Sequence, residues 1–198
     1  MQLTAEQSRR LLDIARDAIH RSLQGQPLND LPQDDPALMQ PAGCFVSLHE
    51  VGTHRLRGCV GRLDASGPLA TVVQQTAVNV LGDPRFTTNR VGLDDLPKLE
   101  IDISVLSPLM PAANPLDFDL LNDGIYLIIS NRAGCFLPQV ARETGWTKEQ
   151  LLDRLCTEKM GFPARMWQHP AARLQKFTTL IVGPEPVEPA GVTPDAGV

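Results

Sequence analysis

Three arginines, two glycines and a cysteine stand within nine residues of the chain, in the segment Arg55–Leu63 (RLRGCVGRL). The remaining residues are apolar, as in a β-strand, and the side chains of a regular strand alternate between its two faces. Regular alternation predicts one face that carries Arg55, Arg57, Cys59 and Gly61. Glycines inside a strand admit a bulge or the close approach of a ligand. A binding or reaction site therefore explains this segment better than structure alone.

Cys59 is the candidate for nucleophilic chemistry. Arginines on its own face would stabilise the thiolate and lower the thiol pKa, which is how proteins make a cysteine reactive. The alternative is a small, buried and inert side chain, because free cysteine is among the most buried residue types. The motif ties no histidine to Cys59, since His54 is five residues away and falls on the opposite face of a regular strand.

The arginines predict recognition of an anionic small molecule or peptide carboxylate. Arg57 and Arg85 carry planar guanidinium groups, which bind carboxylate or phosphate at two points. Gly58 and Gly61 would admit such a ligand to backbone N–H groups. For Arg85 a structural interpretation is equally open, in which an ion pair with Asp83 fixes the turn of the D-P-R-F sequence.

Two further polar residues are candidates for ligand binding. Glu100 shares a strand face with Asp102, opposite the apolar face of that strand, and either pairs with an arginine or does acid–base work. Gln139 follows a proline at an expected helix start, where its amide either contacts a ligand or caps the turn. The candidate ligand-binding residues are therefore Arg57, Gly58, Gly61, Arg85, Glu100 and Gln139.

The sequence predicts neither a metal site nor a cofactor. Cys44, His49, His54 and Cys59 recur every five residues, but a cysteine and a histidine five apart point to opposite sides of a strand, so the four cannot meet at one ion unless a bulge intervenes. The four cysteines, which include Cys135 and Cys156, lie in a chain for which we expect no export signal. They are expected as reduced thiols of a cytoplasmic protein rather than as a disulfide framework.

Composition excludes several classes of protein. The chain has 198 residues, of which 42% are hydrophobic and 21% charged, as in an ordinary globular protein. Its net charge is -5, and this negative charge disfavours nucleic acid and anionic membranes as partners. No run approaches the roughly 18 apolar residues of a membrane span. Residues 1–20 are amphipathic rather than continuously apolar, as a signal peptide would be.

Periodicity indicates an α+β fold with a mainly antiparallel sheet flanked by helices, because the strands form hairpins among helices without strict βαβ alternation. Thr4 and Gln7 form a capping box for a first helix over residues 4–24. The expected later helices cover residues 67–81, 138–145 and 147–160. The expected strands cover 43–50, 55–63, 100–106, 124–130, 135–137 and 177–182. We predict one domain over residues 1–183, with a core at 43–182 and the first helix packed on it, and a disordered tail over 184–198.

Four motifs in order carry a resemblance to a known family. They are RLRGCVGRL, the DPRF at 83–86, LPKLEIDISVLSP at 96–108, and GCFLPQVA at 134–141 followed by GW. From about residue 43 to residue 182 the chain resembles the AMME chromosomal-region protein family, whose prokaryotic members are called AmmeMemoRadiSam system protein A. Cys135 departs from the apolar residue more usual at its position, which argues against an essential role for that thiol.

The resemblance implies two lobes with the RLRGCVGRL segment lining a cleft between them. It also implies association with a MEMO-like protein and a radical-SAM protein, but no established reaction. Three function classes follow. We favour an accessory or substrate-binding component of that system; the alternatives are an enzyme with Cys59 as nucleophile or redox thiol, and a nucleic-acid-associated regulator.

Overall fold

The computed structural model describes residues 2–188, and these fall into two compact units. The first unit contains residues 2–105 and 180–188, and the second contains residues 106–179. Each unit has its own antiparallel sheet and its own hydrophobic core, so the expected α+β class is confirmed. None of the helices in this part of the chain is long and apolar enough to cross a membrane.

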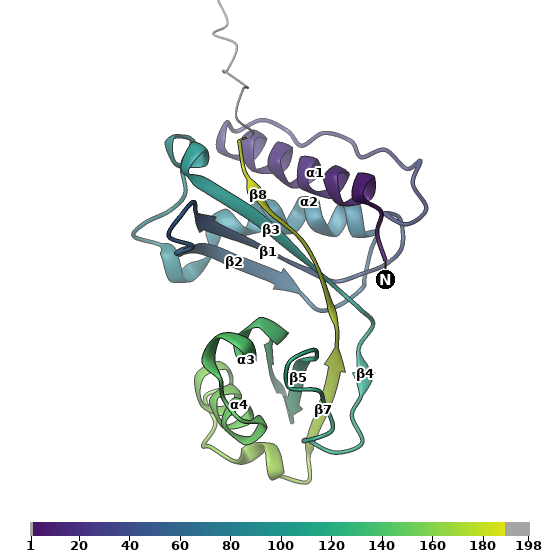
Figure 1. Ribbon diagram of the computed structural model, residues 1–198, viewed down its shortest axis with the longest axis vertical. Coiled ribbons are helices and arrows are strands. Elements are labelled where there is room, and N and C mark those ends of the chain that lie inside the picture. The colour runs from purple at the N-terminus through teal and green to yellow at the C-terminus, as the bar shows by residue number, and fades with distance from the viewer. Residues whose placement is uncertain (1, 189–198) are drawn as a thin grey trace, which may run out of the picture. The chain divides into compact units, whose positions relative to one another are not determined.

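The first unit is a four-stranded sheet in the order β2-β1-β3-β8, with helices α1 and α2 packed side by side along it (Figure 1). Its strands are β1 (Cys44–Glu50), β2 (Leu56–Arg62), β3 (Leu99–Leu106) and β8 (Thr179–Pro186). Its helices are α1 (Ala5–Leu23) and α2 (Leu69–Asn79), followed by the short 3-10 turns η1 (Val80–Gly82), η2 (Pro84–Phe86) and η3 (Leu93–Lys98).

The capping box and the apolar face expected for the first helix are both present in α1. The Thr4 hydroxyl accepts a hydrogen bond from the Gln7 backbone N–H, and the Gln7 side-chain oxygen accepts one from the Thr4 backbone N–H, so the capping box is formed. Apolar residues at helical spacing then bury one face of α1 against α2, in the core that also contains the inner residues of the sheet. The fully buried members of that face are Leu11, Leu12, Ala15, Ala18 and Ile19.

Alternation along the strands divides the first sheet into two chemically different faces. Val46 and Leu48 of β1 and Ile101 and Ile103 of β3 are fully buried in the core that α1 and α2 complete. Two residues that lie opposite each other on neighbouring strands have their side chains on the same side of the sheet. The other face therefore carries the intervening residues, which are largely polar: Ser47, His49, Cys59, Glu100, Asp102 and Ser104.

The second unit is a four-stranded sheet in the order β4-β7-β5-β6, with helices α3 and α4 beside it (Figure 1). Its strands are β4 (Met110–Pro111), β5 (Gly124–Ile129), β6 (Arg132–Phe136) and β7 (Ala172–Phe177). Its helical elements are α3 (Pro138–Thr144), α4 (Lys148–Arg154), the π-helical turn η4 (Leu155–Lys159) and the 3-10 turn η5 (Met166–Gln168). Trp167 is buried in its core.

Three expectations about the C-terminal half are corrected. The helix expected over 147–160 becomes a π-helix after Arg154. The single strand expected at 177–182 is two strands, because the chain breaks at Thr178 between β7 and β8. β8 continues through Pro186 and Val187 is 1% exposed, because Val187 packs in the core of the first unit. Residues 184–188 therefore belong to the fold, and the rest of the expected tail lies outside the described residues.

Candidate functional site

A β-bulge rearranges the arginine-rich segment. Leu48 of β1 lies opposite Gly58, but His49 lies opposite Leu56, so Arg57 is an extra residue of β2 with no partner in the ladder. A bulge of this kind re-aims a side chain and shifts the alternation of the residues before it. Leu56 therefore takes the position on the face of Cys59 that regular alternation assigned to Arg57.

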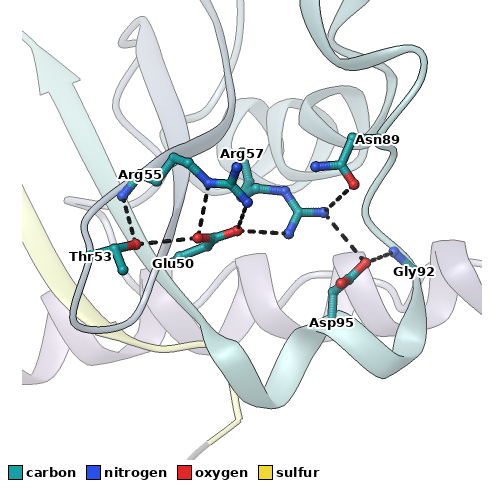
Figure 2. Close-up of polar contacts among 7 residues, drawn as sticks. All are labelled: Glu50, Thr53, Arg55, Arg57, Asn89, Gly92 and Asp95. Carbon is teal, nitrogen blue, oxygen red and sulfur yellow. Dashed lines mark hydrogen bonds and ion pairs between the residues drawn. The ribbon is translucent and has the colours of Figure 1, made fainter.

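Arg57 is instead the centre of a polar network at the end of the β1–β2 hairpin (Figure 2). Its side chain is 7% exposed, and its Nη1 lies 3.4 Å from Glu50 Oε1. Its Nη2 lies 3.4 Å from Asn89 Oδ1 and 3.6 Å from Asp95 Oδ2. Glu50 also binds the guanidinium of Arg55, whose Nε lies 3.0 Å from Glu50 Oε2. Two carboxylates therefore already neutralise the two arginines, and the network joins the hairpin to the loop before β3.

The two glycines of the segment are explained by packing. A Cβ on Gly61 would lie 2.2 Å from the ring of Phe45, the residue opposite it on β1. A Cβ on Gly58 would lie 2.9 Å from the carbonyl oxygen of Val80. Both distances are far below van der Waals contact, so each position requires glycine to let a neighbouring group approach.

Asp83 and Arg85 form the second feature of the site, at the outer edge of β2. Asp83 Oδ2 accepts a hydrogen bond from the backbone N–H of Cys59 at 2.9 Å, and Arg85 Nη2 donates to the Cys59 carbonyl oxygen at 2.9 Å. Arg85 also binds both oxygens of Asp83, with Nε 3.1 Å from Oδ1 and Nη2 2.7 Å from Oδ2. The pair occupies the open edge of β2 much as the backbone of another strand would.

The pairing of Asp83 with Arg85 shifts the pKa values of both side chains toward their charged forms. Burial opposes ionisation of Asp83, but the hydrogen bonds from Arg85 and from the Cys59 N–H outweigh it and lower the pKa of Asp83 to about 2. The Arg85 pKa is raised, first by its hydrogen bond to Asp83. The structural interpretation of the D-P-R turn is therefore correct. The Arg85 side chain is nevertheless 50% exposed. Its guanidinium also interacts with the Cys59 thiol and lies over the ring of Phe86, with Cζ 5.6 Å from the ring centroid.

Cys59 lies in a row of polar residues across three strands. Ser47 of β1 is opposite Cys59 on one side and opposite Asp102 of β3 on the other. Burial raises the pKa of the Cys59 thiol, outweighing the Ser47 hydrogen bond and the charge of Arg85, which lower it. The expectation that Arg55 and Arg57 lower this pKa is wrong, because Arg57 is re-aimed by the bulge and Arg55 lies outside β2, and both pair with Glu50.

Two histidines accompany the carboxylates of β3. His49 Nδ1 lies 3.3 Å from Asp102 Oδ2, and His54 Nδ1 lies 2.6 Å from Glu100 Oε1. The expected pairing of Glu100 with an arginine is therefore wrong. His54 reaches the Cys59 side of the sheet because it precedes β2 in a left-handed turn conformation (φ 53°), outside the regular alternation. The described residues contain no group of three or more His, Cys, Asp or Glu side chains arranged to hold a metal ion.

The structure thus brings together some of the predicted site residues and not others. Cys59 and Glu100 lie on the polar face of the first sheet, and Arg85 lies at the edge of β2 beside Cys59. Arg57 lies in the hairpin network. Gln139 lies in the first turn of α3, in the second unit.

Sequence reasoning did not include Ser47 and His49 in the site. The available signal was their alternation with Val46 and Leu48 on the same strand, which places one hydroxyl and one imidazole on the face away from the core.

The fold and this face define a two-unit α+β protein with a polar surface on one antiparallel sheet. The chain belongs to the AMMECR1 family, whose model matches residues 12–182. It is 35% identical over 187 residues to a Methanothermobacter thermautotrophicus protein, covering 90% of this chain and 95% of the relative. It is 30% identical over 197 residues to a Methanocaldococcus jannaschii protein, covering 96% and 94% of the two chains.

A solved structure has the same fold. The crystal structure of an uncharacterized protein from Pyrococcus horikoshii matches with a TM-score of 0.80 at 30% identity. The match covers 86% of this chain and 88% of that one.

Proposed function

We propose that this protein is a cytoplasmic, ligand-binding accessory component of a MEMO/radical-SAM system, and that it holds an anionic group of a small molecule or peptide beside Cys59. Family membership supports the association with such a system through the resemblance described above. The observation that carries the binding role is the half-exposed Arg85 guanidinium fixed at the edge of β2.

Arg85 is prepared for binding because its own partners hold it in place. Its Nε and Nη2 are bound by Asp83 and by the Cys59 carbonyl, so little side-chain freedom remains to be lost when a ligand arrives. The guanidinium is half exposed and interacts with the Cys59 thiol. A guanidinium is an efficient donor to carboxylate and phosphate. The geometry therefore favours Arg85 over Arg57 as the anion-binding arginine.

The enzyme alternative receives less support. The thiolate is the nucleophilic form of cysteine, and burial raises the pKa of the Cys59 thiol. A neutral thiol beside Ser47 suits contact with a bound ligand better than nucleophilic attack on it.

Calorimetric titration tests the binding role. The purified protein is titrated with a panel of phosphorylated and carboxylated metabolites and peptides, in parallel with Arg85→Gln and with Arg90→Gln, which changes an exposed arginine of the next loop. We expect at least one anion whose affinity falls about tenfold or more in Arg85→Gln, the loss of one charge-assisted hydrogen bond, and is unchanged in Arg90→Gln. No binding by any panel member, or equal effects of the two substitutions, would overturn the proposal. Thermal unfolding of each variant confirms that it is folded.

The accessory role has a separate test. The protein is mixed with purified MEMO-like and radical-SAM proteins encoded in the same genome, and complex formation is followed by size-exclusion chromatography and by calorimetry. We expect a complex with at least one of the two. Independent elution of all three proteins at micromolar concentration, with and without an anion from the panel, contradicts the accessory role but leaves anion binding standing.

A further inference from the structure

Three exposed cations of the second unit each lie over an aromatic ring, where β6 meets the helical segment of α4 and η4. They are Arg132, Lys159 and Arg154, which we define as the cationic face. The rings beneath them are, in the same order, Phe162, Phe136 and Trp146. The charged groups, taken as the arginine Cζ and the lysine Nζ, lie 5.0, 5.7 and 5.4 Å from the ring centroids. All three contacts are within the range of a cation–π interaction.

The side chains of the cationic face cross between β6 and η4. Arg132 reaches from β6 to the end of η4, where its Nη1 donates to the carbonyl oxygen of Met160 at 3.0 Å. Lys159 packs on β6, because a Cβ on Gly134 would lie only 3.1 Å from the Lys159 Cβ, and the glycine lets η4 approach. Lys159 is the last residue of the π-helical turn, and such turns are frequent at functional sites.

Most of the positive charge of this face is not neutralised by carboxylates. The ion pairs formed by the described residues of the second unit are Arg154 with Glu158, at 2.8 Å, and Lys176 with Asp117. Arg132 and Lys159 take part in neither pair. Contact with a ring stabilises a cation without removing its charge. The cationic face therefore presents net positive charge to the solvent.

The cations are spread over a wider surface than one small anion covers. Arg132 begins β6 and Phe136 ends it, so their Cα atoms are four residues, or about 13 Å, apart. The ring centroid of Trp146 lies a further 6.4 Å from that of Phe136. A chain that carries several carboxylates can engage the cations together, and linking the contacts raises the overall affinity.

A nucleic acid fits this face less well than an acidic peptide. Single-stranded nucleic acid binds through bases stacked on aromatic rings as well as through its phosphates. Here a cation already covers each ring, and the rings themselves are buried or half-buried. The net charge of -5 of the whole chain also disfavours a long polyanion.

We infer that the cationic face binds an acidic peptide segment of a partner protein, with carboxylates of that segment on Arg132, Lys159 and Arg154. The inference is independent of the anion-binding role of Arg85, which belongs to the first unit. Glu158 weakens the binding of the segment, because its own carboxylate already contacts Arg154.

Penta-glutamate is the probe that tests this inference. Its binding to the full chain is measured by calorimetry at pH 7 and low salt, beside penta-glutamine and free glutamate. We expect penta-glutamate to bind at least about tenfold more tightly than either control, because neither control offers several linked carboxylates. Added salt should weaken this binding, since the contacts are exposed.

Variants of the cationic face should change the affinity in opposite directions. Lys159→Met keeps an apolar stem on Phe136 but removes the charge, and Arg132→Gln removes the other unneutralised cation. Each should weaken penta-glutamate binding about threefold, the effect of one exposed charged contact. Glu158→Gln should strengthen it by about the same factor. Arg173→Gln, which changes an exposed arginine of β7, should leave it unchanged, and thermal unfolding verifies that each variant is folded.

The outcomes separate this site from the one at Arg85. Weakening by Lys159→Met together with strengthening by Glu158→Gln supports the inference. Equal binding of penta-glutamate and penta-glutamine, or equal effects of Lys159→Met and Arg173→Gln, overturns it. Binding that Arg85→Gln abolishes and Lys159→Met leaves intact also overturns it, and assigns the peptide to the first unit. Tighter binding of an oligothymidylate than of penta-glutamate, weakened by Lys159→Met, overturns it in favour of nucleic acid.

Discussion

The carboxylate of Asp83 binds the backbone N–H of Cys59 at the open edge of β2, where a neighbouring strand would otherwise accept it. Asp83 Oδ2 accepts the N–H of Cys59 at 2.9 Å, and the Arg85 guanidinium that Asp83 holds donates to the carbonyl oxygen of the same residue. A backbone donor and acceptor at an open sheet edge are thereby both satisfied. The D-P-R sequence thus both closes the edge of β2 and fixes the arginine to which we assign ligand binding.

Asp83→Asn should destabilise the protein by about 1–3 kcal/mol at pH 7, because the amide donates where the Cys59 N–H and Arg85 need an acceptor. Urea unfolding of the variant and of the exposed-site control Asp94→Asn measures the difference. A loss no larger than that of the control would show that the Asp83 contacts contribute nothing net.

The same carboxylate predicts a pH dependence. The pKa of Asp83 is lowered to about 2 in the folded protein, so the unfolded chain takes up a proton first as the pH falls. Its contribution, on the order of 2 kcal/mol, is complete above about pH 4 and disappears between about pH 4 and pH 2. Stability plotted against pH should therefore converge for wild type and Asp83→Asn in that range. Parallel curves down to pH 2 would contradict the assignment.

Gly61→Ala should cost about 1–3 kcal/mol, since its Cβ would meet the Phe45 ring at 2.2 Å and the Cys44 carbonyl oxygen at 2.6 Å, and closely packed groups must shift to admit it. Gly67→Ala is the matched control, because nothing lies within 4 Å of a Cβ there. Phe45→Leu should recover part of the loss in the Gly61→Ala background. An unchanged melting temperature for Gly61→Ala would refute the packing explanation.

Arg57→Ala should destabilise the hairpin by about 1–3 kcal/mol, because Glu50, Asn89 and Asp95 lose a shared, mostly buried partner. Hydrogen exchange should accelerate in residues 50–56 and 87–95 more than in α1. Arg90→Ala, at an exposed position in the same loop, is the control. Equal exchange in the two variants would mean that Arg57 does not hold these segments together.

Alkylation of Cys59 should follow a pH profile with a midpoint above the value of about 8.5 for a free thiol, because burial raises its pKa. Ser47→Ala should move the midpoint higher by removing a hydrogen bond to the sulfur, and Asp102→Asn should move it lower by removing a nearby negative charge. Mass spectrometry after iodoacetamide pulses resolves Cys59 from the other cysteines. Rapid modification at pH 7 would instead support the enzyme alternative.

The sequence alone determined the elements whose signals are local. The capping box and apolar spacing of the first helix, the hairpin before residue 63, and the alternation of residues 100–106 all depend on near neighbours in the chain. The turn fixed by Asp83 and Arg85 was also available as an interpretation, because these two residues are close in sequence. The strand β7 was missed because its residues, ARLQKF, show no strong apolar pattern.

The tertiary structure decided which residues of the arginine-rich segment meet. Assigning side chains to the two faces of a strand by counting residues assumes an unbroken ladder. A single extra residue at Arg57 changes the face on which the preceding residues lie. Whether such a bulge forms depends on contacts with segments remote in sequence, here Asn89 and Asp95, and on the approach of Val80 to Gly58. The row of Cys59, Ser47 and Asp102 likewise joins three strands, so only their pairing places a thiol, a hydroxyl and a carboxylate side by side.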